Sequence, residues 1–272
     1  MRMLKRIYMG WFLCGYVLIV TSTLPSWLSW ANGVYLILAG ITALFWLYRQ
    51  VGLRQMGSYF LLCGGISLFS EWFGVHTGLW FGTYAYTEQF APFLFGVPVA
   101  IPFAWCMIIL LSRWIVPNQR FSGIAVAALC AVAIDVLLDP VAVVQAYWLW
   151  ETAGVLSFYE VPWTNFASWW ITSFVILLLT NRYLPTHLFM DNQEYPLSYS
   201  VGSNVRRVTW WSLLQTIWHQ PLLLILVTLE MLFITIAIQH ALWFAVLINL
   251  LLLGILLVCR KYWHPLHRRS EP

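Results

Sequence analysis

Long apolar stretches, separated by short polar segments, run through the chain from one end to the other. A transmembrane α-helix needs about 20 mostly apolar residues. Eight stretches approach that length, and the last two are joined so closely that they predict a helical hairpin. They lie at residues 6–23, 30–48, 57–75, 96–117, 121–138, 165–182, 220–238 and 241–259. The pattern therefore predicts an all-α, polytopic membrane bundle of about eight transmembrane helices.

The composition agrees with this pattern. Hydrophobic residues make up 61% of the 272 positions and charged residues only 9%, with a mean hydropathy of +0.78. A soluble domain carries about 25% charged residues, so this chain lacks the side chains for a water-facing surface. Its net charge of +4 is too small and too dispersed to predict nucleic-acid binding. We expect a six-span core over residues 1–182, a cytoplasmic linker over 183–219, and a terminal hairpin with a basic tail over 220–272.

The basic residues give an orientation to these spans. With eight spans, all fourteen Lys and Arg residues fall on the same side of the membrane. The positive-inside rule makes that side cytoplasmic, which places both termini in the cytoplasm. A wrong number of spans would distribute the basic residues over both sides. The expected location is the cell membrane, crossed several times.

The acidic residues follow a different distribution. Six of them lie at the outer ends of spans or in outer loops, where there is no Lys or Arg to pair with them: Glu71, Glu88, Asp135, Asp139, Glu151 and Glu160. Unpaired acids near a membrane mark either the boundary with water or a site of chemistry. Glu230 lies in the middle of a span, where ionisable groups are functional by default. We expect it outside the site, in helix packing or a partner contact.

Asp135 and Asp139 are the strongest candidates for chemistry. They are four residues apart, so on a helix they share one face, with Cβ atoms about 5–6 Å apart. Pro140 is expected to end this helix, which would leave both acids at its negative end. Burial, a like-charged neighbour and the helix dipole all favour the neutral acid, the form that a general acid requires. Glu71 stands in a similar position near the end of the third span, and His76 follows it as either a proton relay or an interfacial histidine.

Eight tryptophans surround these acids in the sequence: Trp72, Trp80, Trp105, Trp148, Trp150, Trp163, Trp169 and Trp170. Aromatic belts are common at membrane interfaces, and this explanation stays open. The other explanation is an aromatic pocket, because ring faces stabilise cations. Proton donors among aromatic walls suit the protonation of an alkene to a carbocation.

The spacing of these residues resembles that of the membrane carotenoid hydratases. The similarity covers about residues 60–172 and includes Glu71, Gly78, Phe81-Gly82-x-Tyr84-x-Tyr86, Gly96-Val97-Pro98, Ile101-Pro102-x-x-Trp105, Asp135, Asp139-Pro140, Trp148-x-Trp150 and Tyr159-x-x-Pro162-x-x-Asn165. The family is that of the CruF-type and bisanhydrobacterioruberin hydratase-like "carotenoid biosynthesis proteins". The resemblance implies a hydro-lyase that adds water across the terminal double bond of an acyclic ψ-end. The product would be a tertiary 1-hydroxy carotenoid, formed without a cofactor or a metal ion.

This resemblance also implies roles for individual residues. The catalytic acids would be Asp135, Asp139 and Glu71, with the aspartate pair as proton donor and Glu71 positioning and deprotonating water. Residues that would bind the substrate, stabilise the cation or orient groups are His76, Tyr84, Tyr86, Trp105, Trp150, Tyr159, Asn165 and Trp169. Expected partners are an apolar polyene of the lycopene, γ-carotene or bisanhydrobacterioruberin type entering from the bilayer, water, membrane lipids, and other enzymes of carotenoid synthesis.

Two alternatives remain at the level of sequence. An enzyme similar to the lycopene cyclases would use the same acid and the same cation, but an internal alkene would replace water. A lipid-binding or transport protein without chemistry would instead carry polar residues along a path through the membrane. Here the acids gather at one end, with Glu230 as the exception.

Overall fold

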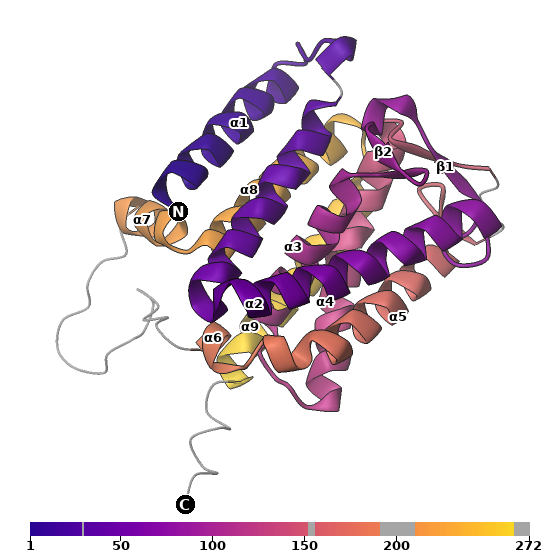
Figure 1. Cartoon of the computed structure of the whole chain (residues 1–272). Coiled ribbons are helices and arrows are strands. Elements are labelled where there is room, and N and C mark those ends of the chain that lie inside the picture. The colour runs from indigo at the N-terminus through magenta and orange to yellow at the C-terminus, as the bar shows by residue number, and fades with distance from the viewer. Residues whose placement is uncertain (29, 152–155, 191–209, 264–272) are drawn as a thin grey trace, which may run out of the picture.

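The computed structural model describes residues 1–28, 30–151, 156–190 and 210–263, and shows a bundle of apolar helices (Figure 1). Six helices in this part of the chain are long and apolar enough to cross a membrane. They are α1 (Arg2–Val20), α2 (Ala31–Thr77), α4 (Phe121–Val144), α5 (Trp163–Thr180), α8 (Pro221–Gln239) and α9 (Trp243–Trp263), and α3 (Ala100–Ile115) is a shorter apolar helix. The expected all-α membrane fold is confirmed.

Helix α2 contains two of the eight predicted spans without a loop between them. Its 47 residues are interrupted at Gly52, whose φ of 84° and ψ of 171° are non-helical. This region of φ/ψ space is open almost only to glycine. Figure 1 shows the two halves of α2 running in clearly different directions from this bend. Each predicted span thus coincides with one helical segment, and the number of membrane crossings stays a prediction.

The predicted linker contains helices of its own. A single short turn, α6 (His187–Met190), follows η3 (Asn181–Tyr183), and α7 (Trp210–His219) precedes α8. Residues 191–209 of the linker, residue 29, residues 152–155 of an outer loop and residues 264–272 of the basic tail lie outside the described residues.

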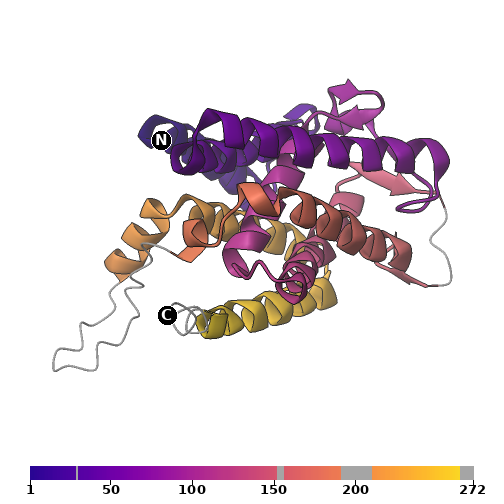
Figure 2. The ribbon, with the colours of Figure 1, turned by 60° about the horizontal axis from the view of Figure 1, so that its bottom comes forward.

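Helix α4 lies at the centre of the bundle and contacts α3, α5, α8 and α9. Figure 2 shows α2 along one face of the molecule and α9 along the opposite face. Most of the α4 side chains are buried, which explains why its sequence is apolar apart from Ser122 and the two aspartates. A helix that packs on all sides has no polar stripe.

The expectation that Pro140 ends this helix is wrong. Helix α4 continues to Val144, one turn beyond the proline. Proline lacks only its own N–H and its φ is close to the helical value, so a buried helix with neighbours on every side tolerates it. Asp139 therefore lies more than a turn before the helix end. The macrodipole acts mainly within the last turn, so its influence on the aspartates is weaker than expected.

Close packing joins α2 to α3. A Cβ atom added at Gly40 would lie 2.6 Å from the backbone oxygen of Phe103, too close for any side chain. Only glycine permits the two helix backbones to approach in this way.

Three small antiparallel sheets, which were not predicted, connect the helix ends near the acids. Strand β1 (Tyr84–Tyr86) pairs with β4 (Trp148–Trp150), so that Tyr84 faces Trp150 and Tyr86 faces Trp148. The other pairs are β2 (Phe93–Leu94) with β3 (Val97–Pro98), and β5 (Ser157–Phe158) with β6 (Val161–Pro162). Two short 3₁₀ turns, η1 (Ser26–Leu28) and η2 (Glu88–Phe90), complete the loops. The β1–β4 pair ties the loop after α2 to the loop after α4.

Candidate active site

Glu71 is a buried carboxylate held entirely by neutral donors. It lies on α2, and its side chain is 5% exposed. Oε2 accepts hydrogen bonds from the hydroxyls of Tyr84 at 2.5 Å and Tyr86 at 2.8 Å, and Oε1 accepts one from Trp105 Nε1 at 3.1 Å. Buried acids are usually paired with a cation, but here three hydrogen bonds satisfy the carboxylate instead.

The β1–β4 pair brings the two tyrosines to Glu71. Residues two apart on a strand point to the same face, so Tyr84 and Tyr86 lie side by side, with Trp150 and Trp148 opposite them. The rings of Tyr84 and Trp150 are 4.8 Å apart between centroids, and those of Tyr86 and Trp148 are 5.8 Å apart. Burial, together with the charge of Glu71, raises the pKa of both tyrosines well above the usual value. Their hydroxyls therefore stay protonated and act as donors.

Asp135 and Asp139 are bridged by one amide. Both lie on the same face of α4 and are fully or almost fully buried. Asn165, in the first turn of α5, donates through Nδ2 to Oδ2 of Asp135 at 3.2 Å and also to Oδ2 of Asp139. Oδ1 of Asp135 is buried without a hydrogen-bond partner among the described residues. The pair therefore retains unused hydrogen-bonding capacity.

One cavity of about 40 Å³ joins these groups. Its polar lining comes from Glu71 on α2, Asp139 on α4 and Asn165 on α5, together with Tyr84 and Tyr86. Asp135 does not line this cavity; it lies one helical turn before Asp139 and shares the Asn165 amide with it. A cavity needs about 10–15 Å³ to admit one water molecule, so this one has room for water.

Aromatic rings form most of the remaining wall. Trp105 and Trp169 are stacked, with centroids 4.1 Å apart and ring planes at 16°. The full lining of the cavity is Leu36, Glu71, Phe81, Tyr84, Tyr86, Phe90, Ile101, Ala104, Trp105, Ile108, Leu138, Asp139, Trp148, Trp150, Asn165 and Trp169. The site thus combines three carboxyl groups with the electron-rich ring faces that favour a cation.

Two of the residues expected at the site lie elsewhere. His76 is exposed; its Nδ1 lies 2.8 Å from the Trp72 carbonyl oxygen, and its ring centroid is 5.2 Å from that of Trp72, with the rings tilted at 36°. Tyr159 accepts a hydrogen bond at 3.3 Å from the backbone N–H of Phe244 and does not line the cavity. Helix α2 continues past Glu71 to Thr77, and the five-residue spacing carries His76 round to the outer surface. The tyrosines that do line the cavity are Tyr84 and Tyr86, which the β1–β4 strand pair places there.

Burial separates the six outer acids into two groups. Glu71, Asp135 and Asp139 are buried, whereas Glu88, Glu151 and Glu160 are exposed. The boundary explanation fits the exposed group. Of the buried group, Glu71 and Asp139 line the cavity, and Asp135 is linked to Asp139 through the Asn165 amide. Glu230 is half-buried on α8 and does not line the cavity.

The tryptophans divide in a similar way. Trp105, Trp148, Trp150 and Trp169 line the cavity, while Trp72 and Trp163 are exposed as in an interfacial belt. The tryptophans thus include a cavity-lining group and an exposed group, and the two explanations of the aromatic cluster stay predictions for these groups.

Eight wall residues were not among the expected site residues: Leu36, Phe81, Phe90, Ile101, Ala104, Ile108, Leu138 and Trp148. Trp148 carried a signal, because Trp148-x-Trp150 mirrors Tyr84-x-Tyr86 and both spacings are typical of a strand with one aromatic face. Leu36 lies in a uniformly apolar span, and the sequence contains no mark that separates it from its neighbours.

Within the described residues, no group of three His, Cys, Asp or Glu side chains is arranged to bind a metal ion.

Comparisons with known proteins bear on this site. The profile of a family described as "Carotenoid biosynthesis protein" matches residues 31–256. That match extends well beyond residues 60–172, to which the sequence resemblance was confined. Over 117 residues the chain is 32% identical to a bisanhydrobacterioruberin hydratase of Haloarcula japonica. The aligned segment covers 40% of this chain and 39% of that protein. The alignment thus spans only about two fifths of this relative. No solved structure matches the chain.

Proposed function

The chain belongs to the carotenoid biosynthesis protein family, and we propose that it is a carotenoid hydratase of the hydro-lyase type. It adds water across the terminal double bond of an acyclic ψ-end and produces a tertiary 1-hydroxy carotenoid, without a redox cofactor. The observation that carries the proposal is the buried cavity in which Asp139, bridged to Asp135, meets Glu71 among aromatic rings. The partial similarity to a protein named as a hydratase supports the same reaction class.

The first step is a proton transfer to carbon. A carboxyl O–H of the Asp135–Asp139 pair protonates the less substituted carbon of the terminal alkene, and the π electrons form the new C–H bond. The positive charge then resides on the tertiary carbon. Asp139 is the donor because it lines the cavity, whereas Asp135 does not line it and is linked to Asp139 through the Asn165 amide. General acid catalysis of this kind contributes about 10²–10⁴-fold.

Aromatic faces stabilise the cation formed in that step. Trp105, Trp169 and Trp150 line the same cavity, and their π-systems are attractive to positive charge. The indole N–H of Trp105 is directed to Glu71, which fixes the orientation of the ring. A rigid wall is an advantage because it need not reorganise while the charge develops.

The last step is the capture of the cation by water. Glu71 fits the role of base, because its two oxygens already accept three hydrogen bonds and are held in place as acceptors. Water attacks the tertiary carbon, the C–O bond forms, and Glu71 accepts the released proton. Transfer of that proton back to the aspartate pair, through water in the cavity, restores the enzyme. The balance of the reaction is alkene plus water to tertiary alcohol.

We further propose that the polyene enters sideways from the bilayer. The site cavity shares Leu36 and Phe90 with a second cavity of about 30 Å³. That cavity shares Asn32, Tyr35 and Leu232 with an apolar groove of about 240 Å³ between α1, α2 and α8. Shared lining residues thus connect the three, from the acids to α1. Such a connected series suits a long, thin, apolar substrate.

Expression in a host that accumulates lycopene or γ-carotene tests the proposal directly. The expected product is heavier than the substrate by the mass of one water molecule and carries a tertiary hydroxyl. A ring-containing product of unchanged mass would identify a cyclase instead. If the carotenoid is unchanged although the protein is folded in the membrane, the hydratase proposal would be wrong, and a binding or transport function would be indicated.

A further inference from the structure

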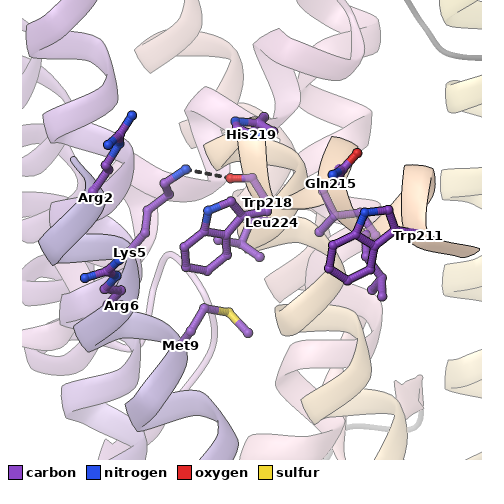
Figure 3. Close-up of a pocket in the computed structure, with 11 residues that line it drawn as sticks. Arg2, Lys5, Arg6, Met9, Trp211, Gln215, Trp218, His219 and Leu224 are labelled. Carbon is purple, nitrogen blue, oxygen red and sulfur yellow. Dashed lines mark hydrogen bonds between the residues drawn. The ribbon is translucent and has the colours of Figure 1, made fainter.

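A large cavity lies at the end of the bundle away from the acids. Its volume is about 690 Å³, and it is enclosed by the start of α1, by α7 and by the start of α8 (Figure 3). Figure 1 shows α7 beside the N-terminal end of α1, far from the strands that carry Tyr84 and Trp148. The proposed hydration has no use for this cavity.

Two helices present one face each to the cavity. Helix α1 contributes Arg2, Lys5, Arg6 and Met9, which share a face at the spacing of a helix. Helix α7 contributes Trp211, Leu214, Gln215 and Trp218, again at the same helical spacing. Three cations therefore face an apolar, aromatic wall. Leu224 of α8 and Ile217 of α7 complete the apolar part of the lining.

Lys5 is the informative member of this group. Its side chain is only 5% exposed, and its Nζ donates to the Trp218 carbonyl at 2.6 Å and lies 4.9 Å from the centroid of that ring (Figure 3). An ammonium group has three N–H donors, and one carbonyl satisfies one of them. Among the described residues, no acidic side chain lines the cavity. A buried cation flanked by two arginines, with no carboxylate among the described residues that line the cavity, favours an anion as the occupant.

We propose that this cavity binds the phosphate headgroup of an anionic phospholipid. Arg2, Lys5 and Arg6 would contact the phosphate, and the upper part of the acyl chains would lie against Met9 and Leu224. Arginine matches phosphate oxygens with two parallel N–H donors, and lysine adds a compact charge. The apolar walls favour a lipid over a free anion, because inorganic phosphate would leave them in contact with water.

The surface of α7 supports a lipid as the occupant. Trp210, Trp211 and Leu214 are exposed on this ten-residue helix. Exposed tryptophan next to basic residues is typical of a helix lying in the membrane interface. The cavity thus opens at the depth where lipid headgroups lie. The proposal does not depend on the hydratase function.

Two matched double variants test this site. In Arg2→Gln/Arg6→Gln the cavity loses two cations. Lys5 is kept because its hydrogen bond to the Trp218 carbonyl also joins α1 to α7. In the control, Arg49→Gln/Arg54→Gln, the same charge is removed from exposed positions flanking the bend of α2. The full chain is placed in nanodiscs of phosphatidylcholine with increasing fractions of phosphatidylglycerol, and thermal unfolding is followed.

The expected result is that phosphatidylglycerol stabilises the parent and the control variant alike. The cavity variant should need about 30-fold more of this lipid, since each lost contact between an arginine and the phosphate weakens binding by a factor of about five. Equal losses in both double variants, or no preference of the parent for phosphatidylglycerol, would overturn the proposal. Inorganic phosphate, added to nanodiscs of phosphatidylcholine alone, is expected to have little effect. If it stabilised the parent as well as the lipid does, a free anion would be the ligand and the lipid assignment would be wrong.

Discussion

At the scale of single residues, Asn165 decides how the two aspartates meet. Its one amide nitrogen serves both carboxyl groups, and it comes from α5 rather than from α4, which carries the acids. Glu71 is held by a separate set of donors from the strand β1 and from α3. The two sets divide the acids into a bridged pair and a single acceptor. That division is the basis of their proposed roles as acid and base.

Asp135→Asn and Asp139→Asn test the donor. Each amide keeps the size of the acid and still accepts from Asn165, but it has no proton to transfer. We expect product to fall by about 10²–10⁴-fold in Asp139→Asn, and Asp135→Asn to be impaired as well. Each variant should fold at least as stably as the parent, because an unpaired buried acid costs free energy. Product is measured by mass and stability by thermal unfolding. Near-normal product from both variants would transfer the acid role to Glu71.

Asn165→Leu tests the bridge between the acids. Loss of the shared donor should destabilise the protein by about 1–3 kcal/mol, since two buried carboxyl groups lose a partner. Activity per folded molecule should fall by about 100-fold, as expected when a reacting group is misplaced. The matched control is Asn249→Leu, which removes another buried amide, bonded to the Ala133 carbonyl away from the cavity. The control should lose stability but keep its activity. Equal activity in the two variants would contradict the bridging role.

At the scale of elements, the bend in α2 sets the position of Glu71. The helix passes through Gly52 in a conformation that excludes side chains, and its second half then carries Glu71 towards the strands. The short β1–β4 pair has a comparable role. Residues two apart on a strand point to the same side, so Tyr84 and Tyr86 both face Glu71. Small backbone features thus position the site that the long helices enclose.

Gly52→Ala should lower the free energy of unfolding by about 1–3 kcal/mol. A Cβ atom at this position meets nothing within 4 Å, so the cost comes only from the backbone conformation. Gly65→Ala is the control, because Gly65 lies in the helical second half of α2 and its Cβ would also meet nothing within 4 Å. That change should be neutral or stabilise the helix by up to about 1 kcal/mol. Equal effects in thermal unfolding would show that the bend relaxes without cost.

At the scale of the whole molecule, the two ends of the bundle differ in chemistry. Buried acids and strands lie at one end, and the basic cavity of α1 and α7 lies at the other. This polarity agrees with the one-sided distribution of Lys and Arg in the sequence. It predicts that the acids face the outer side of the membrane and that the termini are cytoplasmic.

Reporter fusions test this orientation. A fusion at Arg120, before α4, should report the cytoplasm, and one after Pro162, before α5, should report the outer side. One helix separates the two positions, so the signals must be opposite if α4 crosses the membrane. The same signal from both fusions would show that the span assignment around 121–165 is wrong.

The three connected cavities make a second prediction at this scale. Gly15 lines the groove on α1, and Gly15→Trp should fill it. We expect conversion of a full-length acyclic carotenoid to fall at least tenfold, while a short isoprenoid alkene with the same terminal double bond reacts as in the parent. Gly10→Trp is the control on the same helix, because Gly10 does not line the groove and a Cβ there also meets nothing within 4 Å. Equal losses for both substrates would contradict lateral entry.

The amino-acid sequence by itself determined the membrane fold and singled out the three acids that the structure buries. Apolar stretches of fixed length can satisfy their backbone in lipid only as helices, so the helical bundle follows from the local pattern. The spacing of Asp135 and Asp139 placed them on one face for the same reason, because a helix converts four residues into one turn.

The tertiary structure decided which of these acids lie together. Asp135 and Asn165 are 30 residues apart, and Tyr84 and Trp150 are brought together only by strand pairing. His76 and Tyr159 were named from spacing and lie outside the cavity, while Leu36 lines it without any sequence signal. Contacts between distant segments depend on helix angles, on one glycine bend and on backbone pairing, none of which leaves a periodic pattern in the sequence. Local periodicity determines elements, and packing between elements determines the site.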